Sequence, residues 1–390
     1  MIVRRQLPVS SPVTLPGLVH GLRGALGVDE SALLTAELGA RYGMAGVALC
    51  DSGTSALVVA LRAAVPSGGT VAFPSYSCVD LAAAARFTGV RVRLYDLDPS
   101  TLSADLESLE RTLRRGVDVV LAAHLYGYPA DIPAMRTLAE AHGAVLIEDA
   151  AQSAGSRLSG RLAGGLGELS ILSFGRGKGT AGGRGGAVMA ADPSWMARLQ
   201  PHVHALGLAN DSGWSDLTRM TAQWLLGRPM VYGVPAAIPG LRLGEMVYHP
   251  AREPSAISRA AAALVRSAMR LDQDEIACRR RHAAALSDAV RDSVDVTAVR
   301  PIAGAEPGFL RYAVLAATER APAPSLGIAR GYPRALYEQG ELRPQLVDGE
   351  PEPLGGRHLR ESLFTLPVHS HLTTRDLAGL RRWLTTRAPR

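Results

Sequence analysis

The sequence predicts an α/β fold, with a large N-terminal domain built on a mainly parallel sheet and a smaller C-terminal α+β domain. Short apolar runs alternate with helix-length segments as far as about residue 190. These runs are continuous, as expected for strands of a parallel or mixed sheet with both faces covered. After about residue 246 an Ala-rich segment replaces the alternation. We therefore place the domains at residues 1–245 and 246–390.

The first domain is expected to begin with an arm and a short helix in residues 1–30. Gly43 and Gly143 mark the ends of two predicted helices, because glycine readily adopts the left-handed backbone that stops a helix. Residues 205–245 form an insertion whose apolar part, 220–241, contains an arginine and three prolines. That composition argues against a membrane span and favours irregular structure packed on the surface. Strands are predicted at residues 47–50, 71–74, 90–95, 117–124 and 145–147, and helices at 31–43, 55–65 and 131–142.

The second domain begins with an amphipathic helix over residues 255–290, unbroken or broken once. Strands are predicted at 309–317 and 363–366, and a final helix at 374–386. His369 and His371 have no carboxylate or cysteine beside them in the sequence. We interpret them as loop residues and predict no metal site.

The composition is that of a globular protein with a net charge of +6 and a hydrophobic fraction of 47%. Its arginines are spread along the chain, which disfavours a nucleic-acid-binding face and suits a small anionic substrate. Cys50, Cys78 and Cys278 show no CxxC spacing and cannot all pair, which predicts reduced thiols in a cytoplasmic protein. We expect no signal peptide, because no long apolar run follows the first arginines.

Lys178 is the only lysine in the chain, and every other residue in the Lys+Arg total of 42 is arginine. It lies in a glycine-rich loop that no core requires. Arginine can supply positive charge as well as lysine can, but it cannot lose its proton at neutral pH and attack a carbonyl. We therefore predict that Lys178 forms a Schiff base; the alternative is a chance survivor in a surface loop.

Four polar segments follow predicted strands, at residues 51–54, 75–78, 124–126 and 149–152. Because ligands bind at the carboxyl ends of strands in such folds, these segments should converge on one site. The turn at 51–54 opens a helix, so it is either a phosphate site or a plain N-cap by Ser52 or Thr54. Asp149 is either a loop residue or the partner of a pyridinium nitrogen, whose pKa a nearby carboxylate raises. With Lys178, these are the parts that a pyridoxal phosphate (PLP) enzyme needs.

Four segments together resemble a known family. They are SGTSAL at 52–57, FPSYS at 73–77, HLYGYPADIPAMRTLAEAHGAVLIEDAAQSAG at 124–155 and SFGRGKGTAGGRGG at 173–186. The chain is similar, over about residues 30–190, to the DegT/DnrJ/EryC1/StrS group of fold-type I, PLP-dependent enzymes, best known as sugar aminotransferases. The resemblance returns weakly at 365–377 and implies a divergent member.

The resemblance implies a role for each matched position. Lys178 would carry pyridoxal 5'-phosphate and shuttle a proton, and Asp149 would pair with the ring nitrogen. Gln152 would sit by the ring face and its phenolic oxygen. The remaining cofactor contacts would come from Gly53, Thr54, Ser55 and Ser173 around the phosphate, and from Cys78 beside the ring. The family also implies a homodimer with its active site near the subunit interface.

The sequence departs from the family at three places. Cys78 stands where an aromatic usually stacks on the ring, so either Tyr76 takes that place or the ring is held differently. Arg184 replaces the acid that usually lies two residues before a glycine pair. Residues 248–253 lack the Asn that reaches the neighbouring subunit's phosphate. Its substitutes would be Tyr248, His249 or Arg252, each of which can equally be a surface residue.

We predict a PLP-dependent aminotransferase that moves an amino group from glutamate or glutamine to a ketone, such as a nucleotide-linked keto sugar. The alternative is a non-transaminating enzyme such as a sugar dehydratase; dehydratases that resemble this chain replace the lysine with histidine. A remote alternative is nucleic-acid binding through GRGKGTAGGRGG, but RGG segments are usually repeated and disordered. Gly179 after the lysine also excludes a Walker loop.

Overall fold

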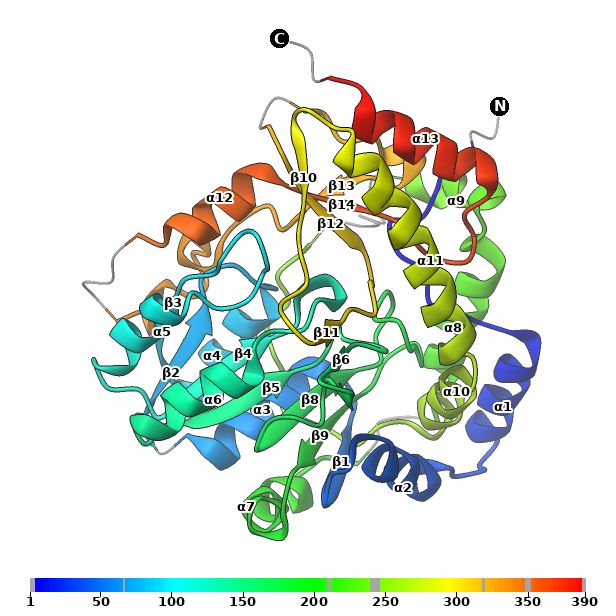
Figure 1. Cartoon of the computed structure of the whole chain (residues 1–390). Helices are drawn as coiled ribbons and strands as arrows, with labels where there is room; N and C mark the ends of the chain where they lie inside the picture. The colour runs from blue at the N-terminus through cyan, green and yellow to red at the C-terminus, as the bar shows by residue number, and fades with distance from the viewer. Residues whose placement is uncertain are drawn as a thin grey trace.

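The computed structural model describes residues 4–65, 67–208, 212–238, 246–317, 320–347 and 352–387. Its larger sheet has seven strands in the order β1-β9-β8-β5-β4-β2-β3 (Figure 1). β9 pairs antiparallel with both of its neighbours, and the other pairs are parallel. The strands are β1 (Gly46–Cys50), β2 (Thr70–Pro74), β3 (Arg91–Tyr95), β4 (Val119–Ala123), β5 (Val145–Asp149), β8 (Leu169–Ser173) and β9 (Gly186–Ala190).

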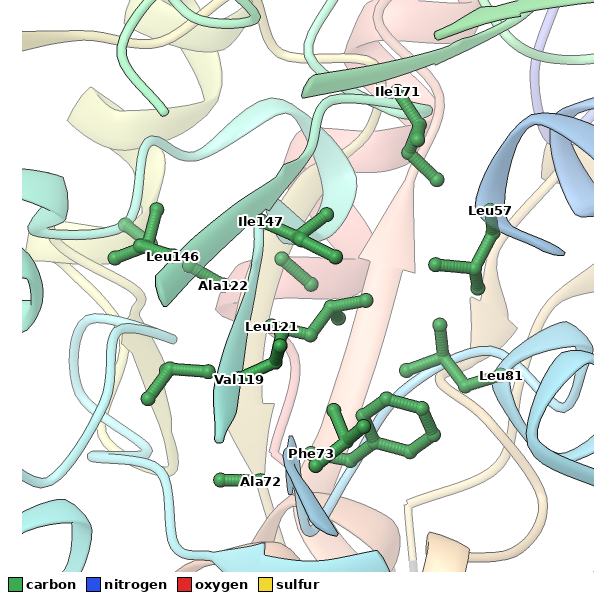
Figure 2. Packing of buried hydrophobic residues seen from close by; sticks show 14 of the residues in the cluster. Leu57, Ala72, Phe73, Leu81, Val119, Leu121, Ala122, Leu146, Ile147 and Ile171 are labelled. Atoms are coloured by element: carbon green, nitrogen blue, oxygen red, sulfur yellow. The ribbon is translucent and has the colours of Figure 1, made fainter. Parts of the chain in front are cut away.

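Helices cover both faces of this sheet, which explains why β2, β4 and β9 are buried along their whole length. Figure 2 shows Leu57 and Leu81 on the same side as Phe73 and Ile147, whereas Leu146 points to the other side. The first face carries α3 (Gly53–Ala64), α4 (Asp80–Thr88) and α7 (Pro193–His204). The second carries α2 (Ser31–Tyr42), α5 (Leu106–Leu113), α6 (Ile132–Ala141) and α10 (Arg259–Met269).

The C-terminal part holds a four-stranded antiparallel sheet in the order β10-β12-β14-β13. Its strands are β10 (Val296–Ala298), β12 (Tyr312–Ala316), β13 (Ala329–Arg330) and β14 (Leu363–Leu366). α11 (Asp272–Arg291) and α13 (Thr374–Thr385) pack on this sheet through a separate apolar cluster. The long helix predicted from residue 255 is thus broken once, between α10 and α11. α12 (Leu354–Ser362) leads into β14.

Smaller elements join the two sheets. β6 (Arg157–Leu158) and β7 (Arg161–Leu162) form a three-stranded sheet with β11 (Ala305–Glu306). The N-terminal arm crosses to α13, where Arg4 Nη2 lies 2.6 Å from Asp376 Oδ2. α1 (Leu15–Ala25) then packs along α10. The arm therefore ties the first residues of the chain to its last helix.

The structure differs from the sequence prediction in the insertion, where α8 (Trp214–Leu226) and α9 (Pro229–Ala236) replace the expected irregular path. Pro229 stands in the first turn of α9, where its missing N–H costs nothing, and Pro235 lies near the end of that helix. Residues 209–211 and 239–245 of the predicted insertion lie outside the described part. Among the described residues, every helix is too short or too polar to cross a lipid bilayer. α5, which Asp105 caps, was not predicted.

Candidate active site

A cavity of about 220 Å³ opens at the carboxyl ends of β4, β5 and β8, beside the N-terminus of α3. It brings together residues that lie more than a hundred positions apart in the sequence. Of the predicted site residues, those that line it are Gly53, Thr54, Cys78, Asp149, Gln152, Ser173 and Lys178. Ser55 is not a lining residue; its hydroxyl lies 2.9 Å from that of Ser52, which is one.

Lys178 lies on the loop between β8 and β9, and glycines shape this loop. Gly177 and Gly179 have positive φ values of 78° and 87°. A Cβ atom on Gly179 would lie 2.5 Å from the Cβ of Ala154, so the loop can approach its neighbour only with glycine there. The loop is closed at its far end, where Gly185 N–H donates to the carbonyl of Asp51 at 2.9 Å. The amine is thereby held over the end of the sheet.

Asp149 ends β5, and its Oδ1 accepts a hydrogen bond of 3.0 Å from Ala151 N–H. Burial raises the pKa of this carboxyl, and the Ala151 bond and the charge of Lys178 only partly offset the effect. The Lys178 charge also acts on the Cys78 thiol. The amine is therefore within electrostatic reach of both groups, in a site where a carboxylate gains from a cationic partner.

His124 and Glu148 form a buried pair beside Asp149. His124 belongs to the predicted segment 124–126 and lines the cavity, whereas Glu148 was not among the predicted site residues. His124 Nε2 lies 2.7 Å from Glu148 Oε1, and Ala130 N–H donates to His124 Nδ1 at 2.9 Å. Because Nδ1 accepts, the imidazole proton must be on Nε2. Although burial raises the pKa of Glu148, hydrogen bonds from His124 and backbone amides more than offset this and lower it. The other donors to Glu148 are Gly164, Leu166, Gly167 and Ser170.

Cys78 lines the cavity, and its Sγ lies 3.3 Å from Asp80 Oδ2. Burial, and secondarily the charge of Asp80, raise the pKa of the thiol, which stays protonated at neutral pH. Tyr76 instead turns toward Tyr332, with ring centroids 5.1 Å apart. It is fully buried and is not a lining residue. Cys78 therefore faces the cavity, and Tyr76, which was considered for the ring-stacking place, does not.

The N-terminus of α3 forms the polar end of the cavity. Ser52 Oγ caps the helix by accepting from Ser55 N–H at 3.0 Å. A Cβ on Gly53 would lie 2.7 Å from the Cβ of Ser173, so glycine is needed where the helix meets β8. The hydroxyls of Thr54 and Ser173 gather there with the positive end of the helix dipole. Such a set of donors suits a phosphate.

Arg184, which replaces an acid of the family pattern, also lines the cavity. Its Nε lies 3.0 Å from Oδ1 of Asp216 in α8. Asp216 is buried and accepts a further bond from Ser258 at 2.7 Å. The negative charge at this corner therefore comes from the insertion, which the sequence motif alone could not show.

Gln152 is fixed from both ends of its amide. Its Oε1 accepts from Tyr126 N–H at 2.9 Å, and its Nε2 donates to the hydroxyl of Tyr332 at 2.5 Å. Tyr126 has a φ of 55°, a left-handed conformation that is uncommon for a residue other than glycine. Tyr332 comes from the C-terminal part, and the sequence did not predict it as a site residue because no motif surrounds it. The C-terminal part thus helps to position a wall of the cavity.

Two further predictions concern surface and loop residues. In the segment 248–253, His249 and Arg252 are exposed, and Glu253 pairs with Arg62 at 2.6 Å. His369 donates from Nε2 to the carbonyl of Leu7 at 2.9 Å. In the part of the chain that the structure describes, no three His, Cys, Asp or Glu side chains are grouped so as to hold a metal ion.

Comparison with known proteins identifies the fold and the family of the chain. The aminotransferase TlmJ from Streptoalloteichus hindustanus has the same fold, with a TM-score of 0.74 over 98% of both chains at 20% identity. The chain belongs to the DegT/DnrJ/EryC1/StrS aminotransferase family, whose sequence profile matches residues 29–326. The family that the motifs indicated and the predicted α/β fold are both confirmed.

Two curated relatives are similar over part of the chain. UDP-N-acetyl-3-dehydro-alpha-D-glucosamine 3-aminotransferase of Acidithiobacillus ferrooxidans is 32% identical over 188 residues, which are 48% of this chain and 49% of that one. L-glutamine:2-deoxy-scyllo-inosose aminotransferase of Streptomyces kanamyceticus is 33% identical over 204 residues, 50% of this chain and 47% of that one. The chain therefore spans about half the length of the curated relatives it matches.

Proposed function

We propose that the protein is a PLP-dependent aminotransferase that moves an amino group from glutamate or glutamine to a ketone, either a nucleotide-linked keto sugar or a related intermediate of secondary metabolism. The observation that carries the proposal is that the only lysine of the chain lines the same cavity as the half-buried Asp149. The names of the relatives, one acting on a UDP-linked dehydro sugar and one on a scyllo-inosose, support the substrate class.

The residues present fit the cofactor. An amine, a half-buried carboxylate and a helix N-terminus with hydroxyl groups are the donors and acceptors that its aldehyde, ring nitrogen and phosphate require. When bound, PLP supplies an aldehyde that carries the amino group and a ring that takes up electrons from the substrate carbon. The phosphate would be held by Gly53, Thr54, Ser55 and Ser173.

The chain's own side chains would divide the remaining work. Asp149 would keep the proton on the ring nitrogen, and the cationic ring would in turn keep Asp149 ionised despite its burial. Lys178 would hold the cofactor through its amine. It would then move a proton between the alpha carbon of the substrate and C4′ of the cofactor, a role that raises the reaction rate by roughly 10²–10⁴-fold. Gln152 would orient the phenolic oxygen, since Tyr126 and Tyr332 fix its amide.

The proposal includes a larger cofactor-binding domain at residues 1–245, a smaller one at 246–390, and a homodimer with the site near the subunit interface. The exposed His249 and Arg252 are the residues of this chain that could reach a partner's cavity. It also includes a cytoplasmic location, which the free thiols of Cys50, Cys78 and Cys278 support.

The test is to replace Lys178 and to move the lysine. Lys178→Arg keeps the charge, and the double variant Arg176→Lys/Lys178→Arg places the only lysine two residues away, at an exposed position. Both should lose the cofactor's visible absorption band, and amino transfer should fall at least about 10²-fold. Unchanged circular dichroism would show that the fold survives. Equal colour and equal activity in Lys178→Arg would overturn the proposal.

A further inference from the structure

α1 has apolar residues on two faces, and the fold covers one of them. Gly17, Gly21 and Gly24 lie on the buried face, where the helix packs closely along α10. A Cβ atom on Gly21 would lie 2.8 Å from Leu264 Cγ, and one on Gly24 would lie 2.6 Å from the carbonyl oxygen of Arg259. Small residues therefore hold α1 against α10, and the large residues on its outer face are not needed for this contact.

The outer face of α1 is a stripe of leucine and valine. Four side chains follow the spacing i, i+4, i+7 and i+11, which places them along one side of the helix. They are 38% to 70% exposed, although a helix on the surface of a globular protein usually has polar residues on its outer face. The four residues are Leu15, Val19, Leu22 and Leu26, the last at the C-cap.

The two helices of the insertion extend this surface. α8 packs against α1 with Leu217 and Met220 turned inward, and α9 packs on α8. Figure 1 shows the three helices on the same side of the molecule. Five apolar side chains at the end of α8, in α9 and just beyond it are 42% to 65% exposed. They are Leu225, Leu226, Met230, Val234 and Ile238.

Apolar exposure is concentrated on these helices. Among the described residues, sixteen large hydrophobic side chains are exposed, and ten of them lie in residues 15–26 and 214–238. The tenth, beside the nine already named, is Trp214 at the start of α8. Single exposed apolar residues are normal, whereas a group of this size marks an interaction surface. We call these ten side chains the apolar face.

The exposed charges beside the apolar face are positive. In residues 15–26 and 214–238, all of which the structure describes, Asp216 is the only acid, and it is buried. Arg23, Arg219 and Arg228 are exposed, and the Cζ of Arg228 lies 5.1 Å from the centroid of the Trp224 ring. Leucine, tryptophan and arginine without exposed acids are the composition of helices that lie on anionic membranes.

An anionic lipid surface complements the apolar face better than a second copy of the chain does. A twofold interface would place the face against itself, so its arginines would meet arginines, and no exposed acid of these helices could pair with them. Phospholipid head groups supply the missing negative charge, and the acyl chains beneath them can receive the apolar side chains.

We propose that the apolar face docks the protein on the surface of an anionic phospholipid membrane. The apolar side chains enter the layer beneath the head groups, and Arg23, Arg219 and Arg228 lie at the level of the head groups. The docked surface is connected to the cofactor cavity, because Asp216 of α8 holds Arg184, which lines that cavity. The proposal goes beyond the proposed function and does not depend on it.

Co-sedimentation of the full-length protein with vesicles tests the docking. Vesicles of equal parts phosphatidylglycerol and phosphatidylcholine should bind the wild type at least about 10-fold more tightly than vesicles of phosphatidylcholine alone. Val19→Glu/Leu22→Glu on α1 and Met230→Glu on α9 should each weaken binding to the anionic vesicles at least about 10-fold, because they place charge in the apolar layer. Raising the salt concentration should also weaken it.

The matched control is Leu354→Glu, which changes a side chain that is 70% exposed on the distant α12. It should bind the vesicles as the wild type does, and circular dichroism should show that all the variants keep the fold. Absent binding by the wild type, equal binding to both kinds of vesicle, or equal binding by the α1, α9 and α12 variants would each overturn the proposal.

Analytical ultracentrifugation without lipid distinguishes a membrane from a second copy of the chain. The α1 and α9 variants should have the same mass as the wild type, because the apolar face is open in the lipid-free protein. A fall to half that mass in these variants would show that a second copy covers the face, and the lipid proposal would fail. Protein without cofactor should still bind vesicles, so failure of the proposed function would leave this result intact.

Discussion

Two charged side chains lie outside the residues that line the cavity and differ in their hydrogen bonding. Glu148, on the sheet side, accepts hydrogen bonds from five donors, including His124. Arg311, on the side of the C-terminal part, has two sealed nitrogens without a partner among the described residues. A fully hydrogen-bonded charge fixes the structure around it, whereas a buried polar atom without a partner costs the fold free energy. The comparison identifies Glu148 as a residue that fixes the structure beside the site.

The largest loss of stability is expected when a fully hydrogen-bonded charge is removed. Glu148→Leu leaves His124, three backbone amides and Ser170 without an acceptor, and should lower the free energy of unfolding by about 3–5 kcal/mol. Glu148→Gln keeps an acceptor oxygen and should lose clearly less. Denaturant titration of both variants measures this difference. A Glu148→Leu protein within about 1 kcal/mol of wild type would show that hydrogen-bond satisfaction does not identify structural charges here.

Asp149 lies between the two cases, since its carboxyl is half-buried, accepts a hydrogen bond from Ala151 N–H and should depend on the cofactor. Asp149→Asn should lower the rate of amino transfer by roughly 10²-fold or more, because the ring nitrogen loses the carboxylate that keeps it protonated. Steady-state kinetics with a glutamine donor would measure this. An active Asp149→Asn enzyme would contradict the assignment.

The same variant has a pH signature in the cofactor-free protein. Burial raises the pKa of Asp149, so its ionised form destabilises the folded state as pH rises above the ordinary Asp range. Asp149→Asn should therefore unfold at higher denaturant concentration than the wild type at neutral pH. The difference should vanish as pH falls below that range, where the carboxyl is protonated in both states. A constant difference across pH would show that Asp149 is not the group responsible.

Asp376 provides a second satisfied charge, on the surface of α13 that the N-terminal arm covers. Arg4, Gln6 and Thr373 donate to it, and the pKa of its carboxyl is well below the usual range because these hydrogen bonds outweigh burial. Arg4→Met should cost only about 1 kcal/mol, since the Arg4 side chain is 35% exposed and solvent screens the pair. Because a lowered pKa stabilises the fold above the ordinary Asp range, the difference should shrink as pH falls through it and below. Urea unfolding at neutral and acid pH would detect this, and a difference that grows in acid would contradict the account.

The smallest effect is expected at Arg184, whose side chain is 45% exposed. Its partner Asp216 keeps Ser258 and Arg219 when Arg184 is removed. Arg184→Met should therefore change the free energy of unfolding by less than about 1 kcal/mol, measured by urea titration. A loss above about 3 kcal/mol would mean that one exposed partner, rather than the whole set, satisfies Asp216.

The sequence alone was sufficient to identify the candidate residues that lie in motifs. Lys178 could be identified because it is the only lysine in the sequence. Asp149 could be identified because it follows an apolar strand and precedes the AAQ segment. The mixed sheet followed from the alternation of apolar strands with helices. These features are local in the chain, so pattern and composition were enough to find them.

The missed residues depend on contacts between distant parts of the chain. Tyr332 meets Gln152 from 180 positions away, and Arg311 meets Tyr126 through a backbone bond that no pattern announces. Asp216 supplies its carboxylate from α8. The sequence analysis had predicted irregular structure in the insertion because of its prolines. Glu148 did carry a signal, since a charged residue inside the apolar run VLIED needs partners when buried.

Peptide mass mapping after borohydride reduction tests the central claim most directly. Reduction makes the bond between the cofactor and its amine permanent, so digestion shows which residue carries the added mass. The account predicts that the mass is found on the peptide that contains Lys178. Added mass at the chain's N-terminal amine, or no added mass in a coloured and active protein, would contradict it.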